Sequence, residues 1–307
     1  MGFVFGPVPS RRLGLSLGVD LVPPKYCSYD CIYCQVGATT KRTIQIKDYV
    51  PLADVMEELR QRLSLCNPDV ITLSGSGEPT LNREIGLIIE RIKEVSDRKI
   101  AILTNGSLLW KEEVRQRLLE ADIIMPTLST AVEATFNRIH RPHPELGLPK
   151  VIEGLRSLKK EFRGFIGLEV MLISGLNDRD AELRELKQVV DELEPDQVQL
   201  NTVVRPPADA SALPLEGARL EEIEKFFGAK ARIISHNRRE RQGSGQVSLR
   251  DSVLEVVKRR PLTASDVARV LKAPLGEVEI LLRGLTRKGD LTERRHGHSV
   301  YYVAKGS

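Results

Sequence analysis

Cysteine is scarce in this sequence of 307 residues, and no long apolar run is present. Four cysteines are too few for a disulfide framework. No stretch approaches the roughly 18 to 20 apolar residues that a membrane-spanning helix needs. We also expect no secretory signal, because residues 1–7 lack a basic region followed by an apolar run. These absences predict a soluble protein with no membrane partner.

The positive charge is concentrated at one end of the chain. The formal net charge is +4, from 46 basic and 42 acidic residues. Residues 250–307 hold 12 of the basic and 7 of the acidic residues, so the rest of the chain is close to neutral. The polar, glycine-containing stretch 237–246 has no apolar period and is typical of a linker. We therefore expect a domain over 1–236, a linker over 237–249 and a basic domain over 250–307.

Apolar strand-like runs alternate with helical periods before the linker. We expect strands at 15–21, 70–73, 100–104, 123–128, 166–173, 198–203 and 232–234. Helical spacing of apolar residues predicts helices near 51–65, 82–96, 110–119, 131–139, 148–161, 179–193 and 217–227. Such alternation indicates parallel βαβ units. Periodicity does not distinguish an open doubly wound sheet from a full or partial (β/α) barrel, but both place chemistry at the carboxyl ends of the strands.

Three of the four cysteines lie within eight positions: Cys27, Cys31 and Cys34. The run follows a strand, so a loop at that strand's carboxyl end would carry three thiolates. Structural zinc usually takes four ligands, and only the fold could bring His140 or Cys66 to this loop. An iron–sulfur cubane with three cysteine ligands instead leaves one iron open to a small molecule. Three unrelated buried cysteines or a zinc loop remain the alternative.

Polar motifs follow the next predicted strands. Ser76-Gly77-Glu78 follows the strand at 70–73, and its glycine would let the backbone approach a ligand closely. Thr104-Asn105-Gly106 and Ser129 follow the next two strands. Each also has a structural interpretation: a glycine loop before a helix, a plain Asn-Gly turn, and a helix cap for 131–139.

The cysteine spacing, with Tyr33 before the last cysteine, resembles the radical S-adenosylmethionine superfamily. The resemblance implies a partial (β/α)6 TIM-like barrel in which Cys27, Cys31 and Cys34 bind a 4Fe-4S cluster. It further implies that the open iron binds S-adenosylmethionine, whose reductive cleavage yields a 5′-deoxyadenosyl radical that abstracts hydrogen from a substrate. The cofactors would supply the difficult chemistry, while the protein positions them and excludes water.

The resemblance also implies a set of contacts to S-adenosylmethionine. The triplet at 76–78 is similar to the superfamily's Gly-Gly-Glu motif for the amino group, with serine in place of the first glycine. Thr104 and Asn105 resemble its Thr-Asn-Gly turn, which faces the cofactor. The implied cofactor-binding residues are Tyr33, Gly77, Glu78, Thr104, Asn105, Ser129, Glu169 and Asn201. No residue is assigned to hydrogen abstraction.

Two arginines and two histidines lie within 138–143. They form either a solvated loop or a cationic patch over the active site, suited to a phosphate or carboxylate substrate. The segment 9–12, with Arg11 and Arg12, would add to such a patch. The longer segment 6–14 resembles the iron–sulfur oxidoreductases related to wyosine-forming tRNA enzymes. Those enzymes carry a second cluster, which the single remaining cysteine, Cys66, excludes here. We expect Cys66 to be a helix-end core residue.

The basic tail resembles a winged helix-turn-helix domain. Helices are expected at 251–259, 267–271 and 274–288, followed by a hairpin over 291–303. The apolar side of the third helix would include Val278, Ile280, Leu281 and Leu285. Arg283, Arg287, Lys288, Arg294 and Arg295 would meet nucleic-acid phosphates, although winged helices also dock proteins. We expect His296 and His298 at the hairpin tip, outside any metal site.

The sequence therefore predicts a radical enzyme with an unidentified substrate, which is either RNA, as in tRNA modification, or a protein docked by the tail. A flavodoxin or ferredoxin type of donor would reduce the cluster, and its oxygen sensitivity favours the cytoplasm. The alternative from another class is a nucleic-acid-binding regulator that senses redox state through its cluster. That alternative explains the tail but gives the open iron and the Gly77-Glu78 motif no purpose.

Overall fold

A computed structural model describes residues 2–234, 253–254, 257, 261–271, 273–297 and 299–304. Its main sheet has the strand order β1-β2-β5-β6-β7-β8-β9-β10, with every strand from β2 onward parallel and β1 antiparallel to β2. The strands are β1 Val4–Ser10, β2 Gly14–Val19, β5 Val70–Leu73, β6 Lys99–Thr104, β7 Ile123–Pro126, β8 Phe165–Leu172, β9 Gln197–Thr202 and β10 Ala231–Ile233. The predicted alternation of strands and helices is confirmed.

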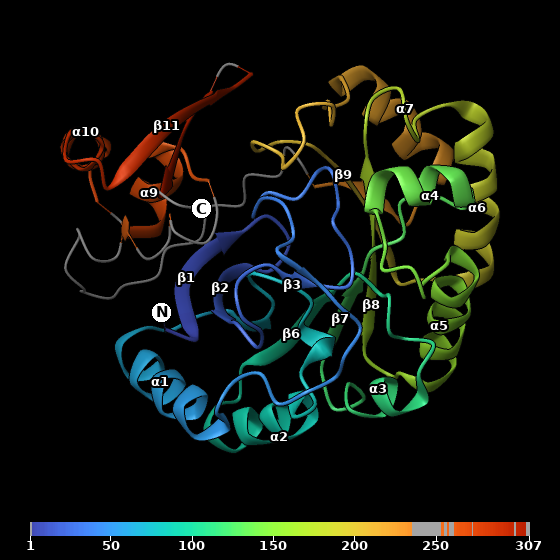
Figure 1. Cartoon of the computed structure of the whole chain (residues 1–307), viewed down its shortest axis with the longest axis horizontal. Helices are drawn as coiled ribbons and strands as arrows, with labels where there is room; N and C mark the ends of the chain where they lie inside the picture. The colour runs from blue at the N-terminus through green and yellow to red at the C-terminus, as the bar shows by residue number, and fades with distance from the viewer. Residues whose placement is uncertain are drawn as a thin grey trace.

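Helices connect the parallel strands along the outer side of the curved sheet (Figure 1). They are α1 Leu52–Leu65, α2 Ile85–Val95, α3 Glu112–Gln116, α4 Glu133–His140, α5 Leu148–Glu161, α6 Asp180–Leu193 and α7 Gly217–Phe227. The apolar side of each long helix packs on the sheet; in α2, for example, Ile85, Ile88, Ile89 and Ile92 are all fully buried. Every residue of β5 is also buried, as a strand covered on both faces requires.

The sheet is curved but not closed. Its end strands, β1 and β10, pair only with β2 and β9 respectively. Helices lie along the outer side (Figure 1), while the loop that carries the cysteines follows β2. This arrangement is a mixed α/β fold of the partial-barrel kind and not a sheet with helices on both faces.

Strand β1 is absent from the sequence prediction. Pro7 and Pro9 lie inside it, and proline removes a backbone donor that a central strand needs. The structure accommodates both because β1 is an edge strand, with an irregular register against β2 between Phe5 and Val8. The predicted helix at 110–119 is shorter in the structure, where α3 spans only Glu112–Gln116.

The tail contains α9 Ala264–Leu271, α10 Leu275–Arg287 and the antiparallel hairpin β11 Leu291–His296 with β12 Ser299–Ala304. The predicted linker 237–249 and most of the predicted helix 251–259 lie outside the described residues, as does His298. Ile280 is 74% exposed, so its assignment to the apolar side of α10 is wrong, because the buried stripe runs through Val278, Leu282 and Leu285.

The tail packs on the barrel through β1 and through the residues after β9. Val8 of β1 belongs to the apolar core of the tail, together with Val267 and Leu282. The Tyr301 hydroxyl donates to the Val204 carbonyl at 2.6 Å, and His296 Nε2 lies 3.2 Å from the Val203 carbonyl oxygen. His296, which pairs with Ser299 at the tip of the hairpin as predicted, therefore also contacts the barrel.

Gly154 tests the packing of α5. A Cβ at this position would lie 2.5 Å from the Leu109 carbonyl carbon, and it would overlap the Trp110 nitrogen. We expect Gly154→Ala to lower the free energy of unfolding, because overpacking costs about 1–3 kcal/mol against a gain in helix propensity of at most about 1 kcal/mol. Urea denaturation measures the difference. The control, Gly217→Ala in α7, meets no atom within 4 Å and should be at least as stable as the wild type. Equal stability of Gly154→Ala and the wild type would contradict the packing described.

Candidate active site

The cysteine loop leaves the carboxyl end of β2 and is held by a small second sheet. Cys27 lies in β3 (Tyr26–Cys27), which pairs in parallel with β4 (Lys41–Arg42). Beyond it, the backbone nitrogen of Cys34 donates to the Cys31 carbonyl at 3.1 Å, and that of Gly37 donates to the Cys34 carbonyl at 3.3 Å. All three cysteines are free thiols and half-buried. The loop thus presents them together on the inner side of the sheet.

Two side chains from distant parts of the sequence contact these sulfurs. Asn105 Nδ2, after β6, lies 3.5 Å from Cys27 Sγ, and His140 Nδ1, at the end of α4, lies 3.3 Å from Cys31 Sγ. His140 is 2% exposed and packs against the rings of Tyr29, Tyr33 and Phe136. Burial lowers the pKa of His140 to about 3, so this imidazole is neutral at physiological pH.

Burial also controls the protonation of the thiols. It raises the pKa of Cys27 to about 12, with a further contribution from the negative charge of Glu78. The pKa values of Cys31 and Cys34 are raised for the same first reason, burial. Without a cation the thiols remain protonated at neutral pH. Binding of a metal group therefore releases protons here.

The donor set fits a cluster better than a single ion. In the part of the chain that the structure describes, no three His, Cys, Asp or Glu side chains lie close enough to hold one metal ion together. Zinc would need four donors around one centre. An iron–sulfur cluster instead places each thiolate on a separate iron, so its ligands are spread more widely. Three thiols on one loop, with the amide of Asn105 near one sulfur and a ring nitrogen of His140 near another, match the second arrangement.

Glu78 is the most heavily hydrogen-bonded carboxylate of the site. Its Oε1 accepts from the Thr80 hydroxyl, the Thr80 backbone nitrogen and the Thr104 hydroxyl, and its Oε2 accepts from the Asn105 backbone nitrogen, all at 2.6–3.1 Å. The side chain is 2% exposed. Burial raises its pKa, and the hydrogen bond from Thr104 is the largest of the effects that oppose this rise. Glu78 therefore joins the ends of β5 and β6.

Gly77 is required by the cysteine loop itself. A Cβ on Gly77 would overlap the Tyr26 carbonyl oxygen, and it would lie 2.8 Å from Val22 Cγ2. The next residue, Glu78, donates its backbone N–H to the same Tyr26 carbonyl at 3.1 Å. The close approach that glycine permits here is therefore to Tyr26, whatever ligand also contacts this segment. The predicted contact of Gly77 with S-adenosylmethionine stays a prediction.

The next two strand-end motifs have internal partners in the structure. The Thr104 hydroxyl donates to Glu78, and Asn105 Nδ2 lies 2.8 Å from Ser28 Oγ as well as near Cys27. Ser129 Oγ accepts from the Met171 backbone nitrogen at 3.3 Å. Ser129 does not cap α4, because the N-cap residue is Val132, whose nitrogen donates to the Thr130 hydroxyl. Ser129 instead joins β7 to β8.

Glu169 and Asn201 lie side by side on β8 and β9. Asn201 Nδ2 donates to Glu169 Oε1 at 3.0 Å, and Arg12 Nη2 donates to the same oxygen at 2.7 Å. Arg11 Nη1 donates to Asn201 Oδ1 at 3.2 Å. The structure thus unites two predicted cofactor contacts with the arginines of the β1–β2 turn. Arg205 also lies near these arginines, and its position just after β9, where strand-end chemistry is expected, is the sequence signal that could have identified it.

The predicted cationic patch at 138–143 does not form. His140 is buried and neutral, Arg138 points to solvent, and Arg141 pairs with Asp209 at 2.5 Å. Helical geometry turns His140 and Arg138 to different sides of α4, so closeness in sequence does not bring their charges together. Cys66 lies at the C-cap of α1, half-buried as expected, with its thiol donating to the Arg62 carbonyl at 3.1 Å.

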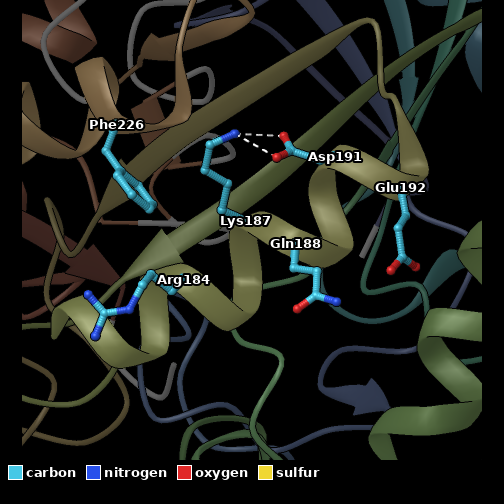
Figure 2. A pocket seen from close by; sticks show the side chains of 6 residues that line it. All are labelled: Arg184, Lys187, Gln188, Asp191, Glu192 and Phe226. Atoms are coloured by element: carbon cyan, nitrogen blue, oxygen red, sulfur yellow. Dashed lines mark hydrogen bonds and ion pairs between the residues drawn. The ribbon is translucent and has the colours of Figure 1, made fainter.

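A surface groove lies away from this site, between α6 and α7 (Figure 2). Its lining contains the exposed ion pair of Lys187 with Asp191, 2.7 Å apart. None of the predicted site residues belongs to this lining, which consists of Arg184, Lys187, Gln188, Asp191, Glu192 and Phe226. It carries no group suited to the chemistry of the cysteine loop, so we place the active site on the inner side of the sheet.

Comparison with known families agrees with this position. The sequence model of the radical SAM superfamily matches residues 21–186, which include the three cysteines and the polar ends of β5, β6 and β7. The chain belongs to the radical SAM superfamily. It is a radical S-adenosylmethionine enzyme, and its cofactors are a 4Fe-4S cluster and S-adenosylmethionine.

Two relatives are similar to this radical S-adenosylmethionine enzyme over almost all of its sequence. A UPF0026 protein of Methanocaldococcus jannaschii is 29% identical over 99% of this chain and 96% of its own. A protein of Brachyspira hyodysenteriae named GTPase Obg is 35% identical over 94% of this chain, which spans only 43% of that protein. This chain contains no Gly-Lys pair and hence no G-x4-G-K-[ST] phosphate loop, so we do not assign it the GTPase activity of that name.

A solved structure supports the fold. A crystal structure of SuiB from Streptococcus suis bound to S-adenosylmethionine matches with a TM-score of 0.53 at 16% identity, over 68% of this chain and 46% of that one. Among the residues described here, no helix is both long enough and apolar enough to cross a membrane.

Glu78→Gln tests the junction between β5 and β6. The amide has one oxygen in place of two, so at least one of the four donors is left buried without an acceptor, which costs about 1–3 kcal/mol. We expect a lower free energy of unfolding in anaerobic urea titrations of the metal-free protein. Glu90→Gln, exposed on α2, is the matched control and should leave it unchanged. If both variants unfold alike, the carboxylate does not hold the strand ends together.

Proposed function

We propose that Cys27, Cys31 and Cys34 bind the 4Fe-4S cluster and that its remaining iron takes S-adenosylmethionine. The observation that supports this assignment is the position of the three half-buried thiols, held on one loop beside the ends of β5 and β6. When bound, the cluster and S-adenosylmethionine supply a 5′-deoxyadenosyl radical by reductive cleavage. The substrate from which hydrogen is then abstracted would lie on the inner side of the sheet.

The protein's own residues position and shield this centre. The amide of Asn105 provides an N–H group near Cys27, and the neutral ring of His140 would provide one near Cys31 in the tautomer protonated at Nδ1. Such contacts stabilise the reduced, more negative form of a cluster. Tyr33 covers His140 edge-on, with ring centroids 5.7 Å apart, and thereby limits the access of water. Gly77, Glu78, Thr104, Asn105 and Ser129 would hold the methionine part of the cofactor, and Glu169 and Asn201 its ribose or adenine.

The structural support for these assignments differs among the residues. Glu78 has one carboxylate oxygen, Oε2, that accepts from a single donor, so this oxygen retains acceptor capacity for an ammonium group. The Thr104 hydroxyl donates a hydrogen bond to Glu78 and would act on the cofactor through that carboxylate. Glu169 and Asn201 would need to exchange an arginine contact for a ribose contact.

We further propose that the tail is a winged helix that presents RNA to the barrel. Its helices α9 and α10 are followed by the hairpin β11–β12, in the order such a domain requires. Five cationic side chains on α10 and the hairpin are exposed: Arg283, Arg287, Lys288, Arg294 and Arg295. The chain would then modify RNA, as in tRNA modification, in the cytoplasm, with a flavodoxin or ferredoxin type of donor and without the second cluster of the wyosine-forming enzymes.

One observation favours a protein substrate instead. Ile280 is 74% and Leu275 45% exposed on α10, and a protein partner would cover both apolar side chains. The third hypothesis, a redox-sensing regulator, would leave S-adenosylmethionine without a role, although it is a cofactor of the superfamily. A footprint on nucleic acid that depends on cluster oxidation, without binding of S-adenosylmethionine, would favour the regulator.

The ligand assignment predicts the iron content of cysteine variants. The reconstituted wild type should hold about four irons per chain and, when reduced with dithionite, convert S-adenosylmethionine into 5′-deoxyadenosine. Cys27→Ser, Cys31→Ser and Cys34→Ser should each lose most of the iron and all of this product, because each removes one of only three ligands. Cys66→Ser serves as the control and should retain both. An intact cluster that never yields 5′-deoxyadenosine with any substrate or partner would sink the catalytic proposal.

The proposal for the tail predicts weaker RNA binding in a charge-depleted variant. Replacing Arg283, Arg287, Arg294 and Arg295 with glutamine should weaken binding to transcribed tRNA. It should also flatten the dependence of log K on log salt by about 0.7–0.9 for each phosphate that the protein no longer neutralises. Arg60→Gln, exposed on α1, is the control. An unchanged salt slope in the fourfold variant would exclude the tail as the RNA surface. A loss of binding only in Ile280→Ser, measured with a protein partner, would favour the protein substrate.

A further inference from the structure

Three arginines meet on the inner side of the sheet, where it opens toward the tail. Arg11 and Arg12 form part of the turn between β1 and β2, and Arg205 follows β9. Their neutral partners are Asn201 for Arg11, at 3.2 Å, Gln199 for Arg12, at 3.4 Å, and Gln35 for Arg205, at 2.8 Å. All three side chains are partly buried, and that of Arg12 is only 13% exposed. The cluster thus joins the turn between β1 and β2 to strands β8 and β9.

The cluster has more positive than negative charge. Within the described residues, Arg12 pairs with Glu169 at 2.7 Å, whereas Arg11 and Arg205 have no carboxylate within 4.0 Å. Asp266 of α9 acts on both from a greater distance. Its carboxylate, however, accepts hydrogen bonds from Thr263 and lies 3.8 Å from Arg269. The two carboxylates, Glu169 and Asp266, do not balance the three guanidinium charges, and Asp266 also interacts with Arg269. The cluster therefore has a net positive charge.

This excess is energetically unfavourable in the protein alone. Burial lowers the pKa of Arg11 to about 10, and the charges of Arg205 and Arg12 add to the effect. Burial likewise lowers the pKa of Arg205. Partly desolvated cations without a counterion are costly, and an anion bound among them recovers that free energy. The arrangement therefore points to an anionic ligand.

We propose that Arg11, Arg12 and Arg205 bind a phosphate group of the enzyme's substrate. The inference rests on the proposed function, because it uses the cysteine loop as the reactive centre. Gln35, the partner of Arg205, directly follows Cys34, so a substrate held by the arginines lies beside that loop. On its other side Tyr301 of the tail, which donates to Val204, borders the cluster. The bound phosphate would thus lie next to the contact between the barrel and the tail.

A phosphate matches the three arginines better than a carboxylate does. A phosphate monoester carries about −1.5 to −2 charges and three acceptor oxygens at neutral pH, whereas a carboxylate carries one charge and two oxygens. The guanidinium group presents its N–H donors in a planar fork that can contact two phosphate oxygens at once. Arg12 Nη2 donates to Glu169, and its Nη1 contacts Gln199 Oε1 and Met125 Sδ, which fixes its position. Its Nε–H and the second N–H of Nη2 are left for the phosphate.

The experiment measures binding of inorganic phosphate to the reconstituted holoenzyme under anaerobic conditions, at constant ionic strength. Titration calorimetry and the melting temperature supply two independent readouts. We expect phosphate to bind the wild type and to raise its melting temperature, whereas acetate at the same concentration does neither. In R11Q/R205Q the dissociation constant for phosphate should rise at least tenfold, and the shift in melting temperature should disappear. Arg60→Gln should behave as the wild type.

A more conservative variant distinguishes a loss of the binding site from a failure to fold. R11K/R205K keeps both positive charges but loses the planar fork, so its phosphate affinity should lie between those of the wild type and R11Q/R205Q. Circular dichroism of each variant without phosphate establishes that it is folded. If the lysine variant binds phosphate as tightly as the wild type, fork geometry is irrelevant and the assignment to the guanidinium groups fails.

Three outcomes would overturn the proposal: equal phosphate affinity in R11Q/R205Q, equal binding of acetate and phosphate, or competition between phosphate and S-adenosylmethionine. The last would place the arginines at the carboxylate of the cofactor. Formation of 5′-deoxyadenosine without substrate, measured in parallel, separates this test from the proposed function. Its presence without phosphate binding removes only the phosphate site, whereas its absence despite phosphate binding removes only the radical chemistry.

Discussion

The carboxylate of Glu78 connects the parts of this molecule on which the candidate site depends. Its four donors come from Thr80, Thr104 and Asn105, at the ends of two neighbouring strands. Asn105 in turn reaches Cys27, and the backbone next to Gly77 is fastened to the residue before that cysteine. A buried charge of this kind persists only because every donor around it is in place. The cysteine loop is therefore positioned by the sheet and not by its own short sequence.

The inner side of the sheet has two regions with different chemical character. Near the cysteines the surroundings are apolar and aromatic, which keeps the thiols protonated until a cation binds them. Near the open side of the sheet, arginines exceed carboxylates, so the surface favours an anion. The Glu169–Asn201 pair stands between the two regions and contacts the arginines directly. The proposed cluster site and the proposed phosphate site would thus be neighbours, linked by this pair.

Local sequence patterns predicted most of the fold, because βαβ units depend on the spacing of apolar residues. Helices such as α5 and α7 occupy their predicted residues, while β1 escaped prediction because its prolines are acceptable only at a sheet edge. The part of the candidate site formed by residues close together in sequence, such as the three cysteines, could be predicted. The remaining contacts of the site join residues far apart in sequence, such as Arg12 with Glu169, 157 positions away. The orientation of His140 likewise depends on α4 packing against the cysteine loop, which no periodicity reveals.

The burial of Val8 means that the barrel and the tail share part of one apolar core. This residue belongs to the first strand of the barrel, yet its side chain completes the apolar core of the tail. A chain cut at the polar stretch would leave β1 with an uncovered apolar side chain and the tail with a gap in its interior. The two parts must therefore evolve as partners at this contact: a larger residue at position 8 demands a smaller one opposite, although the intervening sequence resembles a simple tether.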